Sequence, residues 1–368
     1  MRNLKKVLAL LTVFVLLMGL MAGCSSSNNS SSSDTSNGSS NDNSNASDTN
    51  ASSGKIKIGL SLPTLREERY PRDRDAFTKK AESLGAEVLV QAANNDENLQ
   101  SNQVENLLTQ GIDVLVLDPQ NADSAAALVD EAHKAGVKVI SYDRLIKNTD
   151  VDLYISFDNE KVGELQGKFL TDLVPKGVYF VFAGAPTDNN ATLFKQGAMK
   201  YIQPLADKGD IKIAYDQAIK DWQPEEAMRL CEDALTANNN KVDAILAPND
   251  GTAGGIIQAL AAQGLAGKVP VTGQDAELAA IKRIVAGTQS MTVFKDVRVE
   301  AEKAAELAVQ LAQGKEVSEL SDVNGATNNG KTDVPSVLLT PIVITKDNLD
   351  KELIDSGWFT KEQVYGSK

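Results

Sequence analysis

The chain has 368 residues, and its 50 acidic residues outnumber 37 basic ones, so its net charge is −13. An acidic chain disfavours nucleic-acid binding, which requires a basic patch. With two cysteines and one histidine, the chain cannot form a thiolate cluster or a histidine cage for a metal.

Residues 1–23 are typical of a secretory signal peptide, because three basic residues precede an apolar run over 7–23. The run ends at Met-Ala-Gly-Cys, which resembles a bacterial lipoprotein processing site with Cys24 as the lipidated residue. Removal of 1–23 takes three positive charges and lowers the net charge from −13 to −16. We therefore predict a protein outside the cytoplasm, lipid-anchored to the outer face of the cell membrane. An uncleaved membrane anchor is the alternative.

Residues 25–54 contain only Ser, Asn, Asp, Thr, Ala and Gly. No side chain there can offset the entropy cost of ordering the chain. The segment 24–54 is therefore predicted to be a lipidated cysteine followed by a disordered tether.

From residue 55 onward, β-branched runs alternate with stretches of helical periodicity, which is typical of parallel sheets covered by helices on both faces. The predicted strands are 56–62, 86–92, 113–118, 137–142, 152–157, 178–184, 211–216, 243–248, 269–273 and 290–294. Ten strands exceed one such sheet, so we predict two doubly wound α/β lobes. The predicted lobes are 55–160 plus 296–332, and 161–295 plus 333–368. The multiple crossings between them predict a hinge.

The sequence gives no support for an enzyme or a cofactor. The single histidine, His133, lies in a predicted surface helix, and neither G-x-S-x-G nor G-x-G-x-x-G is present. The segment 322–333 departs from a calcium loop at its fifth and sixth positions and is predicted to be a surface loop. Cys231 lies in a helical pattern and is predicted to be a core residue.

Polar and aromatic residues follow several predicted strands. In parallel α/β sheets, ligands bind beyond the carboxyl ends of the strands, so these residues predict one polar pocket. They are Arg69 and Tyr70; Asp143 and Arg144; Asp188, Asn189 and Asn190; Asn249 and Asp250; Gln274 and Asp275; and Lys295. Paired donors and acceptors of this kind suit a small polyhydroxylated molecule.

Two further expectations concern the composition of this pocket. Tyr70 and Trp222 lie on different predicted lobes and can sandwich the apolar face of a pyranose. Three cations, Arg69, Arg144 and Lys295, nearly balance the three carboxylates of the pocket, as buried charges require.

Long motifs carry a family resemblance over essentially all of 55–365. They include RxxRYxxDRD (66–75), YISFDNEKVGELQ (154–166), PTDNNATLF (186–194), LTANNNKVDAILAPNDGTAGG (235–255) and GQDAELAAIKRIVAGTQSMTVFK (273–295). The chain resembles the periplasmic-type sugar-binding proteins of ABC transporters, in the ribose/galactose-binding group, and is most similar to members that bind D-xylose.

This resemblance implies two lobes joined by a three-stranded hinge, closing on a pentopyranose that is delivered to an ABC permease. It implies sugar contacts by Arg69, Asp143, Arg144, Asp188, Asn190, Asn249, Asp275 and Lys295, with Tyr70 and Trp222 stacking. Tyr70 stands where the xylose binders have Trp, which bears on affinity and on the choice among pentoses. Two other functions stay open: a sensing module that reports sugar to a sensor kinase or chemoreceptor, and a sugar-modifying enzyme.

Overall fold

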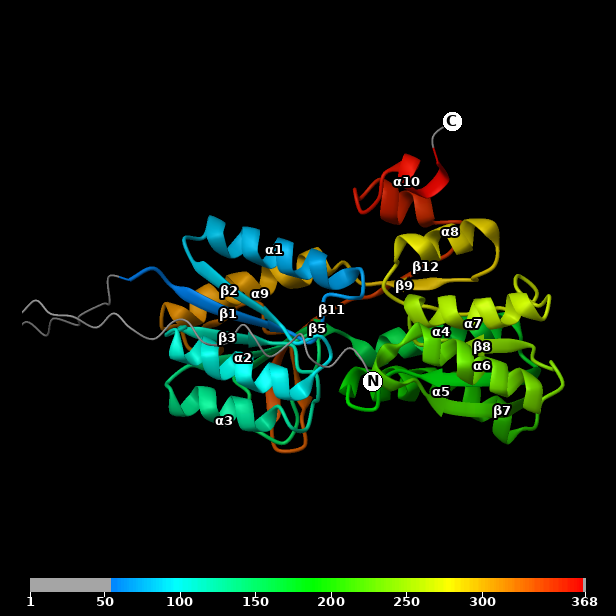
Figure 1. Ribbon diagram of the computed structural model, residues 1–368, viewed down its shortest axis with the longest axis horizontal. Helices are drawn as coiled ribbons and strands as arrows, with labels where there is room; N and C mark the ends of the chain where they lie inside the picture. Colours follow the sequence, from blue (N-terminus) through cyan, green and yellow to red (C-terminus); the bar gives the residue numbers. More distant parts are fainter. Residues whose placement is uncertain (1–53, 367–368) are drawn as a thin grey trace, which may run out of the picture. The chain divides into compact units, whose positions relative to one another are not determined.

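The computed structural model describes residues 54–366. The predicted signal peptide, Cys24 and nearly all of the predicted tether therefore lie outside the described residues. Among the described residues, no helix is both long and apolar enough to cross a membrane. The chain folds into two α/β lobes, which confirms the predicted fold class (Figure 1).

The first lobe contains a seven-stranded sheet in the order β10-β11-β5-β4-β3-β1-β2. All neighbouring pairs are parallel except β10 with β11. The strands are β1 (Lys57–Leu62), β2 (Glu87–Ala92), β3 (Val114–Leu117), β4 (Lys138–Tyr142), β5 (Leu153–Phe157), β10 (Gly325–Asn328) and β11 (Asp333–Leu339).

Helices cover both faces of this sheet because its strands are apolar on both sides. In β3, Val114 and Val116 pack on the side of α1 (Arg69–Ser83) and α9 (Val297–Ala312). Leu115 and Leu117 pack on the other side, against α2 (Glu97–Thr109) and α3 (Ala126–Lys134).

The second lobe has the same layered plan around a sheet of β7-β6-β8. Phe180 and Phe182 of β6 pack toward α6 and α7, whereas Tyr179 and Val181 pack toward α4 and α5. The elements are α4 (Asn159–Leu173), β6 (Gly177–Ala183), α5 (Asn189–Asp207), β7 (Ile211–Ala218), α6 (Pro224–Ala237), β8 (Ala244–Leu246) and α7 (Asp250–Ala262). Cys231 of α6 is fully buried, as predicted.

The rest of the second lobe contains α8 (Leu278–Ala286), β9 (Thr292–Phe294), β12 (Ile342–Ile344) and α10 (Lys361–Tyr365). A shared apolar cluster holds these elements together. The predicted strand 269–273 is reduced to single bridges, Ile245 with Val271 and Gln274 with Val293. These bridges connect β8 through residues 271–274 to the antiparallel pair β9 and β12.

The chain passes between the lobes three times: from β5 into α4, from β9 into α9, and from β11 into β12. The return of 297–312 to the first lobe agrees with the sequence prediction, because α9 packs in the core around β1 and β3. The predicted boundary at 333 was wrong, since Ser336–Leu339 pair with Tyr154–Phe157 of β5. The crossing therefore lies at Thr340-Pro341.

The segment 322–333, predicted to be a surface loop, also contains β10, which pairs antiparallel with β11. Gly325 and the asparagines around it have low strand propensity, so the neighbouring edge of β11 rather than local sequence determines this strand.

Candidate functional site

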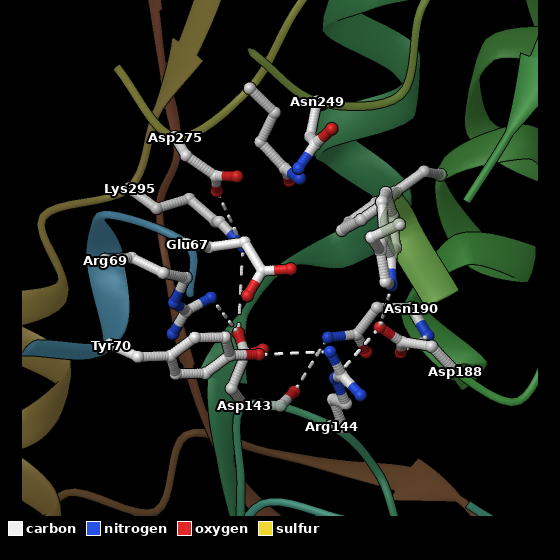
Figure 2. Close-up of a pocket in the computed structure, with 13 residues that line it drawn as sticks. Glu67, Arg69, Tyr70, Asp143, Arg144, Asp188, Asn190, Asn249, Asp275 and Lys295 are labelled. Atoms are coloured by element: carbon white, nitrogen blue, oxygen red, sulfur yellow. Dashed lines mark hydrogen bonds and ion pairs between the residues drawn. The ribbon is translucent and has the colours of Figure 1, made fainter. Parts of the chain in front are cut away.

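One polar cavity lies between the two lobes and has a volume of about 340 Å³. The ten residues expected to contact a ligand all line it, together with Gln274 of the predicted strand-end clusters and with Glu67 and Phe194. Asn189 and Asp250 of those clusters are not among the lining residues. Figure 2 shows the labelled side chains converging from both lobes on one space.

Most lining residues come from the carboxyl end of a strand or the start of the helix that follows. Asp143 and Arg144 follow β4, Asp188 and Asn190 follow β6, and Lys295 follows β9. This arrangement is the one expected for a binding site on parallel sheets.

Arg69 is held almost completely by carboxylates. Its Nε and Nη2 donate to Asp73 at 3.2 Å each, Nη2 also to Glu300 at 3.4 Å, and Nη1 to Asp143 at 2.8 Å. Burial alone would lower the pKa of Arg69, but the surrounding carboxylates, Asp143 first, raise it well above its usual value. A guanidinium has five N–H donors, so one on Nη1 is left for a ligand.

Arg144 links both lobes at the base of the cavity. Its Nη1 donates to the Pro119 carbonyl at 3.2 Å and its Nη2 to the Tyr70 hydroxyl at 3.0 Å. Its Nε lies 3.0 Å from Asp188 Oδ2, in the second lobe, and 3.6 Å from Asp118 Oδ1. The guanidinium is therefore fixed in one orientation before any ligand binds.

Lys295 lies on the side of the cavity formed by the second lobe. Its Nζ is 3.7 Å from Asp143 and 3.6 Å from Asp275, and 5.6 Å from the centre of the Phe194 ring. Burial would raise the pKa of Asp143, but Arg69 and Lys295 together lower it to about 2. Asp143 is therefore a permanent carboxylate, and the Lys295 ammonium has donors available for a ligand.

The backbone at Asp143 is strained and is held by hydrogen bonds. Its φ is +53°, in the left-handed region that costs a non-glycine residue about 1–3 kcal/mol. Its carbonyl accepts three hydrogen bonds, from Tyr154 Oη at 3.0 Å, Ser156 Oγ at 2.8 Å and Asn190 Nδ2 at 3.0 Å. Asn190 therefore connects the second lobe to the first at this point. Trp222 and Asp275, which also line the cavity, have positive φ as well.

Trp222 forms an apolar wall on the second lobe. Its ring lies so close to Gly184 that a Cβ there would come within 2.0 Å of it, so only glycine fits at that position. Its indole Nε1 donates to Asp188 Oδ2 at 3.2 Å, and its ring meets Phe194 edge-on with centres 6.4 Å apart. Tyr70 lines the same cavity from the first lobe, as predicted.

Three acceptor atoms at the cavity are buried without a hydrogen-bond partner among the described residues. They are Glu67 Oε2, Gln274 Oε1 and Asp275 Oδ1. Glu67 projects into the middle of the labelled side chains in Figure 2. Buried polar atoms are rarely left unpaired, so these oxygens indicate positions for donors of a ligand, such as hydroxyl groups.

The sequence predicted that three cations of the pocket are nearly balanced by three carboxylates, but this set omitted other buried acids. Arg69, Arg144 and Lys295 pair with Asp143, Asp188 and Asp275 respectively. The structure adds three more buried acids behind the cavity: Asp73, Asp118 and Glu300. Burial raises the pKa values of all three, those of Asp118 and Glu300 well above the usual range.

Two lining residues, Glu67 and Phe194, were not predicted, and their signals in the sequence are weak. Glu67 lies two residues before Arg69, and Phe194 lies one helical turn after Asn190 on α5, the spacing that places two side chains on one face.

Two α/β lobes that enclose a buried polar cavity, with three chain crossings between them, define a binding protein that holds its ligand between the lobes. The chain belongs to the periplasmic binding protein family, since the sequence profile described as "Periplasmic binding protein domain" matches residues 58–316. Membership of a family of binding proteins confirms the prediction that the chain is not an enzyme.

Curated relatives match most of the chain. The D-xylose-binding periplasmic protein of Escherichia coli (strain K12) is 52% identical over 314 residues, which are 85% of this chain and 94% of the relative. The protein of the same name from Haemophilus influenzae is 51% identical and covers 86% of this chain and 94% of its own.

A solved structure shares the fold. The carbohydrate transporter solute-binding protein of Chloroflexus aurantiacus, in complex with D-glucose, superimposes with a TM-score of 0.77 at 36% identity. The match covers 84% of this chain and 98% of that protein.

Proposed function

We propose that the protein captures a monosaccharide, D-xylose, between its two lobes and delivers it to an ABC permease. The observation that carries the proposal is the cavity, in which fixed cations, carboxylates and unpartnered acceptors surround about 340 Å³. Sugar hydroxyls donate and accept at once, so they match a site of this composition.

The proposed sugar contacts are Arg69, Asp143, Arg144, Asp188, Asn190, Asn249, Asp275 and Lys295, with Tyr70 and Trp222 stacking on the pyranose faces. Asn249 is an example of a lining residue with a side-chain donor available for the sugar. Its Oδ1 accepts from the Thr252 backbone N–H at 3.0 Å, and no hydrogen bond within the described residues engages its Nδ2. To these contacts we add Glu67 and Gln274 as acceptors, since each has an unpaired buried oxygen at the cavity.

The choice of D-xylose is supported by the two relatives that carry this sugar in their names and are 51–52% identical to this chain. Delivery to an ABC permease is supported by a structural relative described as an ABC transporter solute-binding protein, from Clostridium phytofermentans, with bound β-D-glucose. The glucose complexes make the hexose the most informative competitor.

Calorimetric titration of the purified protein with D-xylose, D-ribose, L-arabinose, D-glucose and D-galactose tests the proposal. Single-site binding of D-xylose, tighter than that of the other four, is expected. Binding of another sugar in preference to D-xylose would retain the transport class and reject the substrate. Absence of heat with all five would reject the sugar-binding function.

We also propose that the mature protein is a lipoprotein anchored through Cys24 to the outer face of the cell membrane, with 25–54 as the tether. The support is the order of signal-type apolar run, cysteine and polar tether in the sequence. Metabolic labelling with a fatty acid tests it, because label on the wild-type protein and none on Cys24→Ser is expected.

A second candidate function is sensing. One relative that is 36% identical, from Rhizobium radiobacter, is described as a multiple sugar-binding periplasmic receptor. Deletion of the permease separates the two functions: a sugar response that survives the deletion favours a sensor, and its loss favours transport.

A further inference from the structure

The segment 66–72, between β1 and the first turns of α1, has side chains of two kinds. One kind lines the cavity: Glu67, Arg69 and Tyr70. The other kind lies outside the cavity lining and contacts the second lobe: Arg66, Glu68 and Arg72. Within these seven residues, side chains that line the ligand cavity therefore alternate with side chains that contact the second lobe.

Glu68 caps a helix of the opposite lobe. Its Oε2 accepts from the backbone N–H of Leu278, the first residue of α8, at 3.0 Å. The N-cap residue of that helix, Glu277, makes no side-chain capping hydrogen bond of its own. Because unpaired N–H groups at a helix N-terminus favour a negative charge, a carboxylate from the first lobe stabilises α8 only while the lobes are together.

Arg72 supports Glu68 and makes a contact of its own. Its Nη2 donates to Glu68 Oε1 at 2.8 Å, and its guanidinium lies 4.1 Å from the centre of the Trp358 ring and 5.1 Å from that of Phe359. Trp358 in turn donates from Nε1 to the carbonyl of Ala276 at 3.0 Å. Ala276 directly follows Asp275, a lining residue of the cavity.

Arg66 completes the set at the rim of the cleft. Its Nη2 donates to the carbonyl of Asp221 at 2.8 Å and reaches that of Trp222 at 3.4 Å. Arg66 contacts the backbone of Trp222 directly, and Glu68 contacts Leu278, three residues after Asp275. Arg72 reaches the segment after Asp275 only through Trp358, which donates to Ala276.

We propose that Glu68 and Arg72 form a latch that keeps the lobes closed without touching the ligand, and so sets the rate at which the ligand leaves. The inference rests on the proposed function, because the leaving rate is measured with D-xylose. Opening the cleft separates Glu68 from Leu278 and Arg72 from Trp358, whereas the cavity residues within each lobe keep their positions. Loss of the latch therefore speeds release and leaves the preference among sugars unchanged.

The test compares three latch variants and one control variant of the full chain with the wild type by stopped-flow measurement of D-xylose dissociation. Glu68→Ala and Arg72→Met should each raise the dissociation rate about fivefold, corresponding to about 1 kcal/mol. Glu68→Gln retains an acceptor oxygen and should lie between Glu68→Ala and the wild type. Glu82→Ala is the matched control, since it removes the same charge from an exposed position at the far end of α1.

The ratio of affinities for D-xylose and D-glucose distinguishes a latch from a cavity residue. The ratio should stay within about twofold of the wild type in every latch variant. Dissociation rates equal to that of Glu82→Ala, or a changed ratio, would overturn the proposal.

Small-angle scattering keeps the latch testable if none of the sugars binds, which would refute the proposed function alone. The radius of gyration of Glu68→Ala should then exceed that of the wild type and of Glu82→Ala. Equal radii would overturn the latch.

Discussion

Replacement of Trp222 by alanine should weaken sugar binding strongly, because this ring is the apolar wall of the cavity on the second lobe. The indole is 7% exposed, and the face that remains toward the cavity would be covered by a pyranose. With about 250 Å² for a whole Trp side chain, 7% leaves roughly 20 Å² for a sugar to cover, which contributes about 0.5 kcal/mol at about 25–30 cal/mol per Å². The specific aromatic contact adds about 0.5–1.5 kcal/mol, so the expected loss of affinity is about five- to 30-fold.

Two further variants separate the roles of the indole. Trp222→Phe retains an aromatic face but loses the N–H that donates to Asp188 at 3.2 Å. Asp188 still accepts from the Asn190 backbone N–H and pairs with Arg144, so the loss of one neutral donor should cost about 1 kcal/mol. Trp222→Phe should therefore bind more tightly than Trp222→Ala.

The second tryptophan allows a fluorescence measurement. Trp358 is also buried in the second lobe and lies outside the cavity, but it contacts Arg72 of the latch. Trp358→Phe should therefore keep the ratio of affinities for D-xylose and D-glucose within about twofold of the wild type, while its affinity for D-xylose falls by no more than about fivefold. The protein has two tryptophans, so in Trp358→Phe the remaining indole fluorescence reports Trp222 alone and should change when sugar binds. Calorimetry gives the dissociation constants, and thermal unfolding shows that each variant is folded. A folded Trp222→Ala protein with wild-type affinity would refute the stacking role.

Three further predictions concern other parts of the chain. Arg144→Met should abolish measurable sugar binding and lower the free energy of unfolding by about 3–5 kcal/mol, because it leaves Asp188 and Asp118 buried without their cation; urea denaturation measures this, and an unchanged midpoint would contradict it. Burial raises the pKa of Glu277 from 4.5 to about 9, so the folded protein binds this proton more tightly and stability due to Glu277 falls as pH rises between these values. Glu277→Gln should therefore gain stability relative to the wild type from pH 5 to 9, and parallel profiles would count against this assignment. Cys24→Ser should move the protein from the membrane fraction to the soluble fraction, and continued membrane association would favour an uncleaved anchor.

The sequence predicted the lobes and the cavity because both depend on regular patterns. β-Branched runs separated by helical periodicity identify the strands, and polar residues directly after those runs lie at one edge of a parallel sheet. Asp143, Asp188 and Asn249 were identifiable on this basis alone. The family resemblance added the roles of these residues, and the structure brings them to one cavity.

The assignment of β11 to the first lobe could not be predicted in the same way. The run 334–345 reads as one continuous apolar stretch, and its division depends on which neighbouring strand offers free backbone groups. Ser336–Leu339 complete the edge of β5, whereas Ile342–Ile344 pair with β9 in the other lobe. Pairing partners far away in sequence, rather than propensity, determine such a boundary.

The buried acids behind the cavity were missed for a different reason. Asp73 lies inside the helix α1 and Glu300 inside α9, where a carboxylate in the sequence is normally read as a solvated surface residue. Asp73 lies four residues after Arg69 on α1, so the spacing alone allows this pair, but it does not show that the pair is buried. Only the packing of α1 against α9 in the same core buries the pair and brings Glu300 to Arg69. A sequence pattern within one helix does not contain this information.

Two layers of acids explain how buried guanidinium groups can exist before a neutral ligand arrives. A buried guanidinium loses its hydration, and a sugar cannot return a charge to it, so the protein must supply the compensating carboxylates itself. Asp143, whose pKa is lowered to about 2, and Asp188 pair with Arg69 and Arg144 at the cavity. Behind them, Asp73, Glu300 and Asp118, whose pKa values burial raises, place oxygens beside the two guanidinium groups and orient them. Since both guanidinium groups are already paired and oriented, the proposed sugar has only to replace water at their remaining donors. The cost of ordering the site is therefore met on folding, and binding energy remains available to hold the lobes closed.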